Sequence, residues 1–340
     1  MDSENTEMIE QTNIPPVEER DCDCAVFLKK GQLSETPAVP AEELPLIRGK
    51  STGRFAALLR KLLFAVPVLA LLAGGLWTLT CLTDFDWALG HIETGSLWFT
   101  LALVLWGLGF AATAALMLVG RQVRQYRFPT AGMGEVFCSF LAAALFGVLG
   151  LRQILTAFTT APSSAAVIDT GALSKLAAGF LFLTALYFLC TGIGRRGILP
   201  TALAMGGCVS IMLVLFRDYF RFDLPLNSPV RNLSMLAYAA LLLFFIAETR
   251  VHVDLWYTGV PFTVFADLSV ILLTGGYGLA ELVLSFTGNG QFSMIEGAAF
   301  FGAAGLAFFR LKQLPALIGD HLPPPPTEDE IRKAEKKRKK

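Results

Sequence analysis

The chain has 340 residues, of which 54% are hydrophobic and 16% are charged, and its 28 basic and 28 acidic residues give a formal net charge of zero. The charged residues gather in the two tails and in short connectors between long apolar runs. This distribution is typical of a membrane protein and excludes a large soluble domain. We expect no nucleic-acid partner and no cofactor.

Residues 1–53 precede the first apolar run and carry eleven acidic against five basic residues. Prolines are scattered among them, so the composition favours a disordered acidic leader in the cytoplasm over a folded domain. The leader has no basic start followed by an apolar segment and a small-residue cleavage site, so no removable signal peptide is predicted. The first apolar run is therefore expected to act as the targeting signal.

Apolar runs recur through residues 54–312, which we interpret as a transmembrane helical domain. Runs of about 20 residues can cross about 30 Å of hydrocarbon, and unbroken apolarity indicates helices because barrel strands would alternate. The predicted spans cover residues 55–81, 95–120, 133–158, 172–192, 199–216, 232–247, 261–286 and 293–310. The predicted fold class is thus all-α, a polytopic transmembrane helix bundle of about eight spans. The fifth and sixth runs are the shortest, and a re-entrant hairpin is the alternative for them.

The orientation follows from basic residues in short connectors, which mark the cytoplasmic side of a membrane protein. With eight crossings, the following residues fall on one side: Arg54, Arg60, Lys61, Arg121, Arg124, Arg127, Arg195, Arg196, Arg250, Arg310 and Lys312. This arrangement predicts that both termini are cytoplasmic. We expect the plasma membrane as the location.

The stretch between the fifth and sixth spans is an exception, because it places Arg217, Arg221 and Arg231 on the outer side. Asp218 lies three residues before Arg221, so the two side chains can meet on one helical turn. One interpretation is a salt-bridged helix end. The other is that Arg217 and Arg221 form a cationic site at the outer face for an anionic headgroup or solute.

The outer connector after the first span carries Asp84, Asp86, His91 and Glu93 within ten residues. Carboxylates and imidazole bind divalent cations, so this connector is a candidate metal site. An ordinary polar outer loop is the alternative interpretation. The same four residues are the best candidates for a membrane-embedded enzyme, although the sequence contains no zinc-protease helix and no serine-nucleophile elbow.

Two acidic residues, Asp267 and Glu281, fall inside the seventh span, where an unpaired ion is costly and tends to face a partner or a wet cavity. They are about 21 Å apart along a straight helix. Thr274, Gly278 and Glu281 all return to within about 40° of Asp267, which predicts one polar, small-residue stripe. This stripe is a candidate ion or transport path, and interhelical ion pairing is the alternative.

A basic partner for Glu281 can come from a neighbouring span. Arg152 lies near the outer end of the third span and Lys175 near the start of the fourth. Both are close to the expected depth of Glu281, and we include Arg152 in the candidate path.

Residues 313–340 are predicted to form a proline-rich linker and a basic cytoplasmic tail. Four consecutive prolines at 323–326 precede the basic end, which comprises Lys336, Lys337, Arg338, Lys339 and Lys340. Such a cluster is typical of segments that bind anionic lipids, and a solvated topology anchor is the alternative.

Small-solute or ion transport is the leading functional hypothesis, because it accounts for the acidic stripe of the seventh span. The alternative is a sensor or scaffold that acts through its cytoplasmic tails, and a membrane-embedded enzyme is third. The expected partners are the lipid bilayer and either a membrane protein or a second copy of the chain.

Overall fold

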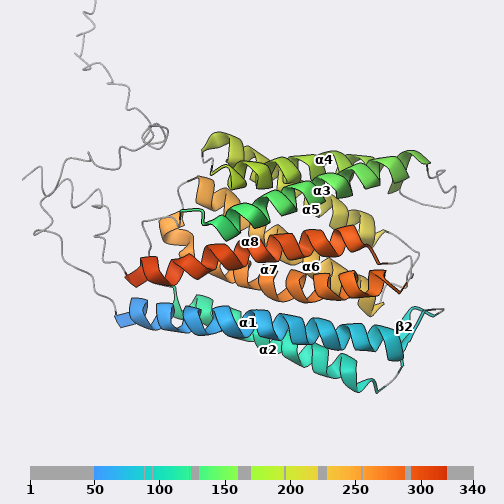
Figure 1. Ribbon diagram of the computed structural model, residues 1–340, viewed down its shortest axis with the longest axis horizontal. Coiled ribbons are helices and arrows are strands. Elements are labelled where there is room, and N and C mark those ends of the chain that lie inside the picture. Colours follow the sequence, from blue (N-terminus) through green and yellow to red (C-terminus); the bar gives the residue numbers. More distant parts are fainter. Residues whose placement is uncertain are drawn as a thin grey trace, which may run out of the picture. The chain divides into compact units, whose positions relative to one another are not determined.

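The computed structural model describes residues 50–319 except residues 88, 94, 122, 124–129, 160–169, 195–196, 221–227, 254–255 and 288–291. The described residues form eight α-helices and one short antiparallel hairpin (Figure 1). The helices are α1 (Lys50–Thr83), α2 (Leu97–Val119), α3 (Met133–Thr159), α4 (Thr170–Gly192), α5 (Ile198–Tyr219), α6 (Pro229–His252), α7 (Trp256–Ser285) and α8 (Met294–Gly319). The hairpin joins β1 (Phe85–Asp86) to β2 (His91–Ile92). All eight helices are long and apolar enough to cross a membrane, which confirms the predicted all-α polytopic bundle.

The fifth and sixth runs form full-length helices of 22 and 24 residues rather than a short hairpin. Helix α6 begins at Pro229, which suits the first turn of a helix because that position needs no N–H donor. The helix continues beyond its predicted end at 247 as far as His252. Helix α8 likewise continues beyond residue 310 to Gly319. The α6 extension carries Glu248 into the bundle, and Arg310, the last residue of the predicted eighth span, is buried there as well.

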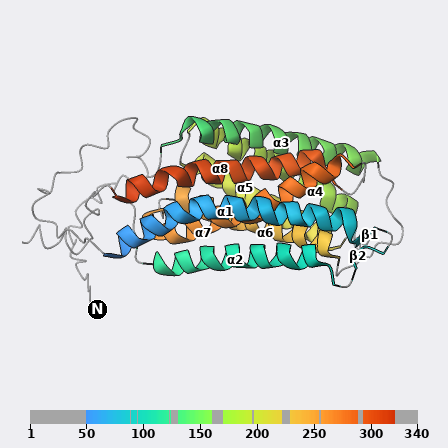
Figure 2. The same ribbon diagram turned by 60° about the horizontal axis from the view of Figure 1, so that its bottom comes forward.

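Helix α7 lies at the centre of the packing and contacts α1, α2, α6 and α8. In its apolar stretch 72% of the residues are buried, against 28% in α2, so α7 is enclosed by protein and α2 is peripheral. Figure 2 shows α1 between α2 and α8, in agreement with its contacts to both. The remaining helices follow in a chain of neighbours, with α8 packed on α3, α3 on α4, α4 on α5 and α5 on α6.

Glycines allow α7 to approach its neighbours closely. A Cβ atom added at Gly74 of α1 would lie 2.3 Å from the carbonyl oxygen of Gly276 in α7. A Cβ atom at Gly278 of α7 would lie 2.9 Å from the carbonyl oxygen of Gly297 in α8. Such small-residue contacts are typical of membrane helix pairs. They bring the polar side chains of α7 directly against those of the adjacent helices.

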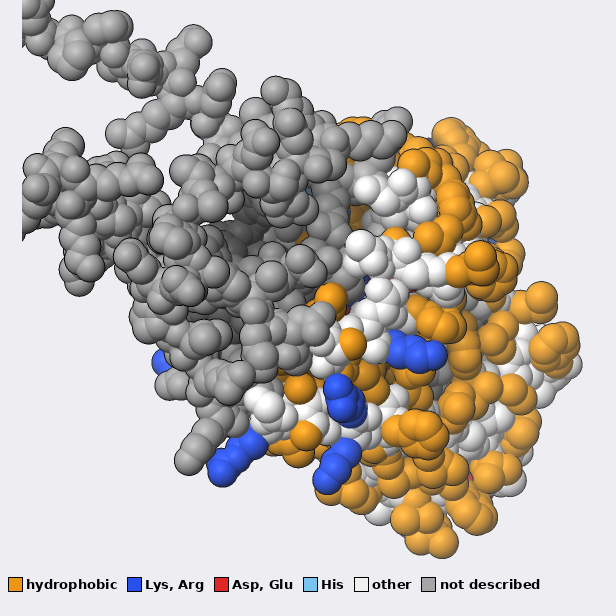
Figure 3. All heavy atoms as spheres, turned by 60° about the vertical axis from the view of Figure 1, so that its left-hand side comes forward, with side chains coloured by type: hydrophobic (Ala, Val, Ile, Leu, Met, Phe, Trp, Pro, Cys, Tyr) orange, Lys and Arg blue, Asp and Glu red, His pale blue; other side chains and the backbone are white. Residues whose placement is uncertain are grey.

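The outer surface of the bundle is apolar. Large hydrophobic side chains such as Phe64, Leu118 and Met133 are 80%, 75% and 90% exposed. Figure 3 shows hydrophobic side chains over much of the face in view, with lysine and arginine side chains gathered at one side of it. A surface of this kind and size is unsuited to water and suited to lipid. The chain is therefore a multi-pass membrane protein whose apolar surface contacts the bilayer.

Candidate functional site

Ionisable side chains from five helices meet inside the bundle, toward the end at which α1 begins and α8 ends. We call this group the Arg310 cluster. It comprises Glu135 of α3, Tyr187 of α4, Glu248 and His252 of α6, Asp267 of α7 and Arg310 of α8. Residues Glu135, Tyr187, Glu248, Asp267 and Arg310 are each at most 3% exposed. The cluster is thus a charged site enclosed by protein in a membrane-spanning bundle.

Arg310 and Glu248 form the core of the cluster. The Nη1 of Arg310 donates a hydrogen bond to Oε1 of Glu248, and the Tyr187 hydroxyl donates to Oε2 of the same carboxyl group. The Nε of Arg310 also donates to Oε1 of Glu135 at 3.4 Å. The Nε2 of His252, one turn after Glu248, lies 3.9 Å from Oε2 of Glu248. Both oxygens of Glu248 therefore have donors, as a buried carboxylate requires.

Asp267 is held differently, because neither of its carboxyl oxygens has a hydrogen-bond partner among the described residues. Its side chain is fully buried and interacts electrostatically with Arg310, Glu248 and Glu135. The Oε2 of Glu135 and the hydroxyl of Ser139, one turn farther along α3, are also buried without such a partner. Burying polar oxygens without donors is costly, so this half of the cluster is not explained by packing alone.

The charges of the cluster are unequal. Three carboxyl groups, those of Glu135, Glu248 and Asp267, surround the single guanidinium of Arg310. One carboxylate balances the guanidinium, and the other two leave an excess of negative charge if they are ionised. Excess charge inside a membrane bundle is expensive. The composition of the cluster thus favours the binding of protons or of a cation.

A second polar group lies at the opposite end of α7, near the β1–β2 hairpin. The Tyr277 hydroxyl donates to Oε1 of Glu281 at 2.8 Å, and the backbone N–H of Ser293 donates to Oε2 at 2.8 Å. The hydroxyl of Tyr238 donates to Oε1 of Glu296 at 2.5 Å. Glu281 is 3% exposed, so this group is also enclosed. In contrast to Asp267, Glu281 has a donor for each of its oxygens.

Arg152 reaches this second group, and Lys175 makes a different contact. The Nη1 of Arg152 donates to the Ser293 hydroxyl at 2.5 Å, so Arg152 and Glu281 share Ser293 as a neighbour. The amine of Lys175 instead lies 4.8 Å from the ring centroid of Phe158. Of the two partners considered from the sequence, the structure brings Arg152 close to Glu281.

Two members of the predicted stripe, Thr274 and Gly278, lie between Asp267 and Glu281 on α7. Thr274 donates its hydroxyl hydrogen bond to the Val270 carbonyl of its own helix at 2.6 Å, and Gly278 packs against Gly297. Asp267 and Glu281 therefore belong to separate polar groups at the two ends of α7.

Only Asp267 of the six members of the Arg310 cluster was a candidate site residue from the sequence, and Tyr187 and His252 had no predicted role. Arg310 was assigned to a connector after the eighth span, which is wrong, because α8 continues to Gly319 and buries Arg310. Glu248 and Glu135 were likewise given no role. A usable signal was present, since Leu311, Leu314 and Ile318 extend the buried apolar pattern past Arg310.

Two arginines of the stretch from 217 to 231, Arg217 and Arg231, form hydrogen bonds within the protein. The Nε of Arg217 donates to Oδ1 of Asp218 at 2.8 Å, and the Nη2 of Arg231 donates to the backbone carbonyl of Tyr219. The Arg217 and Asp218 side chains are only 12% and 15% exposed. Arg221, the partner predicted for Asp218 and the second half of the predicted anion site, lies outside the described residues.

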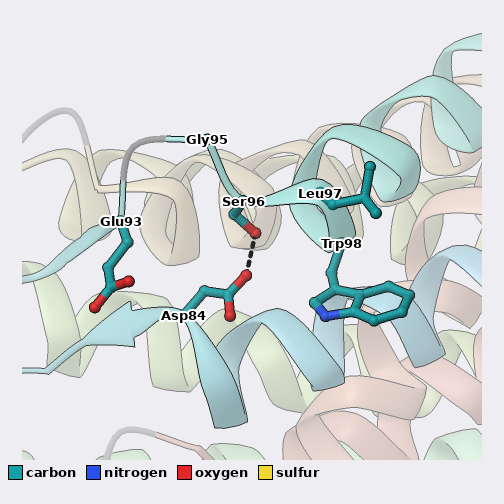
Figure 4. Close-up of a pocket in the computed structure, with 6 residues that line it drawn as sticks. All are labelled: Asp84, Glu93, Gly95, Ser96, Leu97 and Trp98. Carbon is teal, nitrogen blue, oxygen red and sulfur yellow. Dashed lines mark hydrogen bonds between the residues drawn. The ribbon is translucent and has the colours of Figure 1, made fainter.

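Asp84 is the centre of a hydrogen-bonded turn beside a pocket of about 270 Å³, which is lined by Asp84, Glu93, Gly95, Ser96, Leu97 and Trp98 (Figure 4). The hydroxyls of Ser96 and Thr83 each donate to Asp84 at 2.5 Å, and these bonds hold the pKa of Asp84 below its ordinary value. Ser96 in turn accepts from the N–H of Phe99 at the start of α2. Asp84 therefore fastens the hairpin to α2.

The other members of the candidate metal site contribute to the same hairpin. Asp86 and His91 are paired across β1 and β2, and Asp86 accepts a hydrogen bond from the N–H of Leu89. Within the part of the chain that the structure describes, no group of three or more His, Cys, Asp or Glu side chains could hold a metal ion. The basic residues Lys336–Lys340 and the leader before Lys50 lie outside that part.

Comparisons of the chain with family models, with curated proteins and with solved structures give no match.

Proposed function

We propose that this protein is an ion-coupled transporter of a small solute in the plasma membrane, and that the Arg310 cluster binds the coupling ion. The observation that carries the proposal is Asp267, which is fully buried on the most enclosed helix and has no hydrogen-bond partner for either oxygen among the residues that the structure describes. Acidic groups enclosed in membrane bundles commonly mark ion pathways.

The position of the cluster supports a role in conformational change. Its members come from α3, α4, α6, α7 and α8, so a change in the charge of Asp267 alters contacts among five helices. Closely packed helices tend to switch between discrete arrangements because they do not deform continuously. An ion that binds one arrangement better than the other shifts their populations, and this difference is the physical basis of coupling.

The group around Glu281 supplies a second ionisable site at the other end of α7. In the proposed transporter, Asp267 and Glu281 exchange ions with opposite sides of the membrane. Asp267 lies toward the cytoplasmic side, on which both termini are also proposed to lie. Arg217 interacts electrostatically with Glu296 near this second site, which links the end of α5 to the group around Glu281. The basic tail at 336–340 is proposed to hold anionic lipids.

The alternatives have less support. A scaffold would act through the tails, which lie outside the described residues. An enzyme was proposed for Asp84, Asp86, His91 and Glu93, but Asp84 and Asp86 are used in holding the hairpin.

The test begins with a thermal-shift screen of purified protein against ions and metabolites, because a ligand that binds only the folded state raises the melting temperature. Uptake of the solute found is then measured in proteoliposomes with and without an imposed ion gradient. The parent is expected to accumulate solute only with the gradient, and Asp267→Asn is expected to lose that dependence.

Ser269→Ala is the matched control, because Ser269 is buried on the same helix and its hydroxyl also lacks a partner among the described residues. The control should retain coupled uptake. Asp267→Asn protein with unchanged gradient-driven uptake of every transported solute would contradict the proposal.

A further inference from the structure

We infer that the coupling ion is a proton and that Asp267 carries it as a carboxylic acid, beside an ionised Glu248 that is paired with Arg310. The identity of the coupling ion rests on the transport function proposed above. The binding of a proton by Asp267 does not, and it can be measured on purified protein without any transported solute.

The distribution of donors identifies which carboxyl group is charged. Glu248 has Arg310 on one oxygen and the Tyr187 hydroxyl on the other, so an ionised form is stabilised there. Asp267 has no donor on either oxygen within the described part of the chain. A proton bound to one Asp267 oxygen removes the charge from the group that has the fewest means of stabilising it.

Few free oxygens are available for a metal cation. Among the described residues, the two oxygens of Asp267 and the Oε2 of Glu135 have no hydrogen bonds, and the Ser139 hydroxyl beside Glu135 adds a fourth oxygen. Hard cations such as Ca²⁺ and Mg²⁺ need about six or more oxygen ligands. The guanidinium of Arg310 adds a positive charge at the same place and repels a metal ion. A proton needs only one oxygen, and an O–H group is uncharged.

The charged groups that face Asp267 come from three elements. Arg310 approaches from α8, Glu248 from α6, and Glu135 from α3. Among the side chains that the structure describes, the two other helices packed on α7 add none, since Arg54, Arg60 and Lys61 of α1 are exposed and α2 contains no charged residue. The protonation state of Asp267 therefore depends on one basic group, Arg310, and two acidic groups, Glu248 and Glu135.

The cluster extends toward the end of the bundle at which α3 begins and α6 ends. Glu135 lies in the first turn of α3 and His252 is the last residue of α6, and their side chains are 3% and 6% exposed. In the exchange step, a proton leaves hydronium or a buffer acid and forms an O–H bond with the Asp267 carboxylate, and release reverses this step. No other bond forms or breaks.

The experiment is infrared spectroscopy of the purified full-length protein at about pH 7, where a free aspartate of pKa about 3.9 is ionised. A protonated carboxyl has a C=O absorption distinct from that of a carboxylate, and the absorption shifts in D₂O. We expect this band in the parent, a loss of one carboxyl per chain in Asp267→Asn, and no change when Na⁺ replaces K⁺ in the buffer.

Glu135→Gln and Glu281→Gln are the comparison variants, because each removes a different buried carboxyl group. Retention of the Asp267 band in both is expected. A full-strength band in Asp267→Asn would overturn the inference. The absence of a protonated-carboxyl band in the parent protein would also overturn it, and that result does not depend on whether a variant folds. Loss of the parent band on addition of Na⁺ would instead identify a metal-cation site. Failure of solute uptake with the band present would contradict the transport function and leave the proton site standing.

Discussion

Replacing Arg310 by methionine is the most direct perturbation of the cluster, because it removes the only guanidinium and keeps an unbranched side chain. Arg310 donates to the carboxyl groups of Glu248 and Glu135, which are 1% and 3% exposed. Removing one partner of a buried ion pair leaves its partner uncompensated and costs about 3–5 kcal/mol. We therefore expect the free energy of unfolding of Arg310→Met to fall by about that amount.

The assay is equilibrium unfolding in detergent or bicelles, with Lys312→Met as the matched control. Lys312 lies two residues farther along α8 and is exposed, so its replacement should change stability by no more than about 0.5 kcal/mol. Adding Glu248→Gln to Arg310→Met should recover about 1 kcal/mol or more, because the amide needs no counter-charge. Equal stability of Arg310→Met and Lys312→Met, or strict additivity in the double variant, would refute the proposed pairing.

Three further results are expected. Gly74→Ala should destabilise the protein by about 1–3 kcal/mol in the same unfolding assay, because its Cβ would meet the Gly276 carbonyl, whereas Gly75→Ala, with nothing within 4 Å, should be tolerated. The lowered pKa of Asp84 stabilises the hairpin at neutral pH, and this stabilisation is lost as pH falls through that pKa; Ser96→Ala should raise the pKa toward its ordinary value in an NMR titration, and an unchanged pKa would contradict the turn. In a cysteine-free protein, His91→Cys should react with an impermeant thiol reagent from outside intact cells and Arg121→Cys should not; the reverse pattern would overturn the orientation.

The number and type of the helices could be predicted because each span is a long apolar run, and the bilayer allows such a run only one backbone structure. The ends of the spans were harder to predict. We predicted that the sixth and eighth spans end where charged residues begin, at residues 247 and 310. In the structure, Glu248 and Arg310 stabilise each other across α6 and α8. Two residues far apart in sequence thus remove the cost that each would incur alone, and single-sequence hydropathy does not contain that information.

Only part of the candidate site could be predicted, because the sequence shows charged residues within apolar runs but not which helices are neighbours. Asp267 and Glu281 were recognisable because apolar residues flank them on both sides. Their partners were not, apart from Arg152, since pairing depends on which helices are neighbours. The helical periodicity predicted that Thr274 and Gly278 share a face with the two acids, and in the structure Gly278 packs against Gly297 while Thr274 donates to the Val270 carbonyl.

One measurement compares two modes of transport in the same proteoliposomes. Exchange of labelled for unlabelled solute at equal concentrations requires the moving helices but no ion gradient, whereas accumulation requires coupling. If Asp267 binds the coupling ion, Asp267→Asn protein with a near-parental melting temperature will exchange solute but will not accumulate it against its own concentration gradient. Ser269→Ala protein will both exchange and accumulate the solute. Accumulation by Asp267→Asn at the parental level, or equal loss of exchange and accumulation together with a lowered melting temperature, would contradict a coupling role for Asp267.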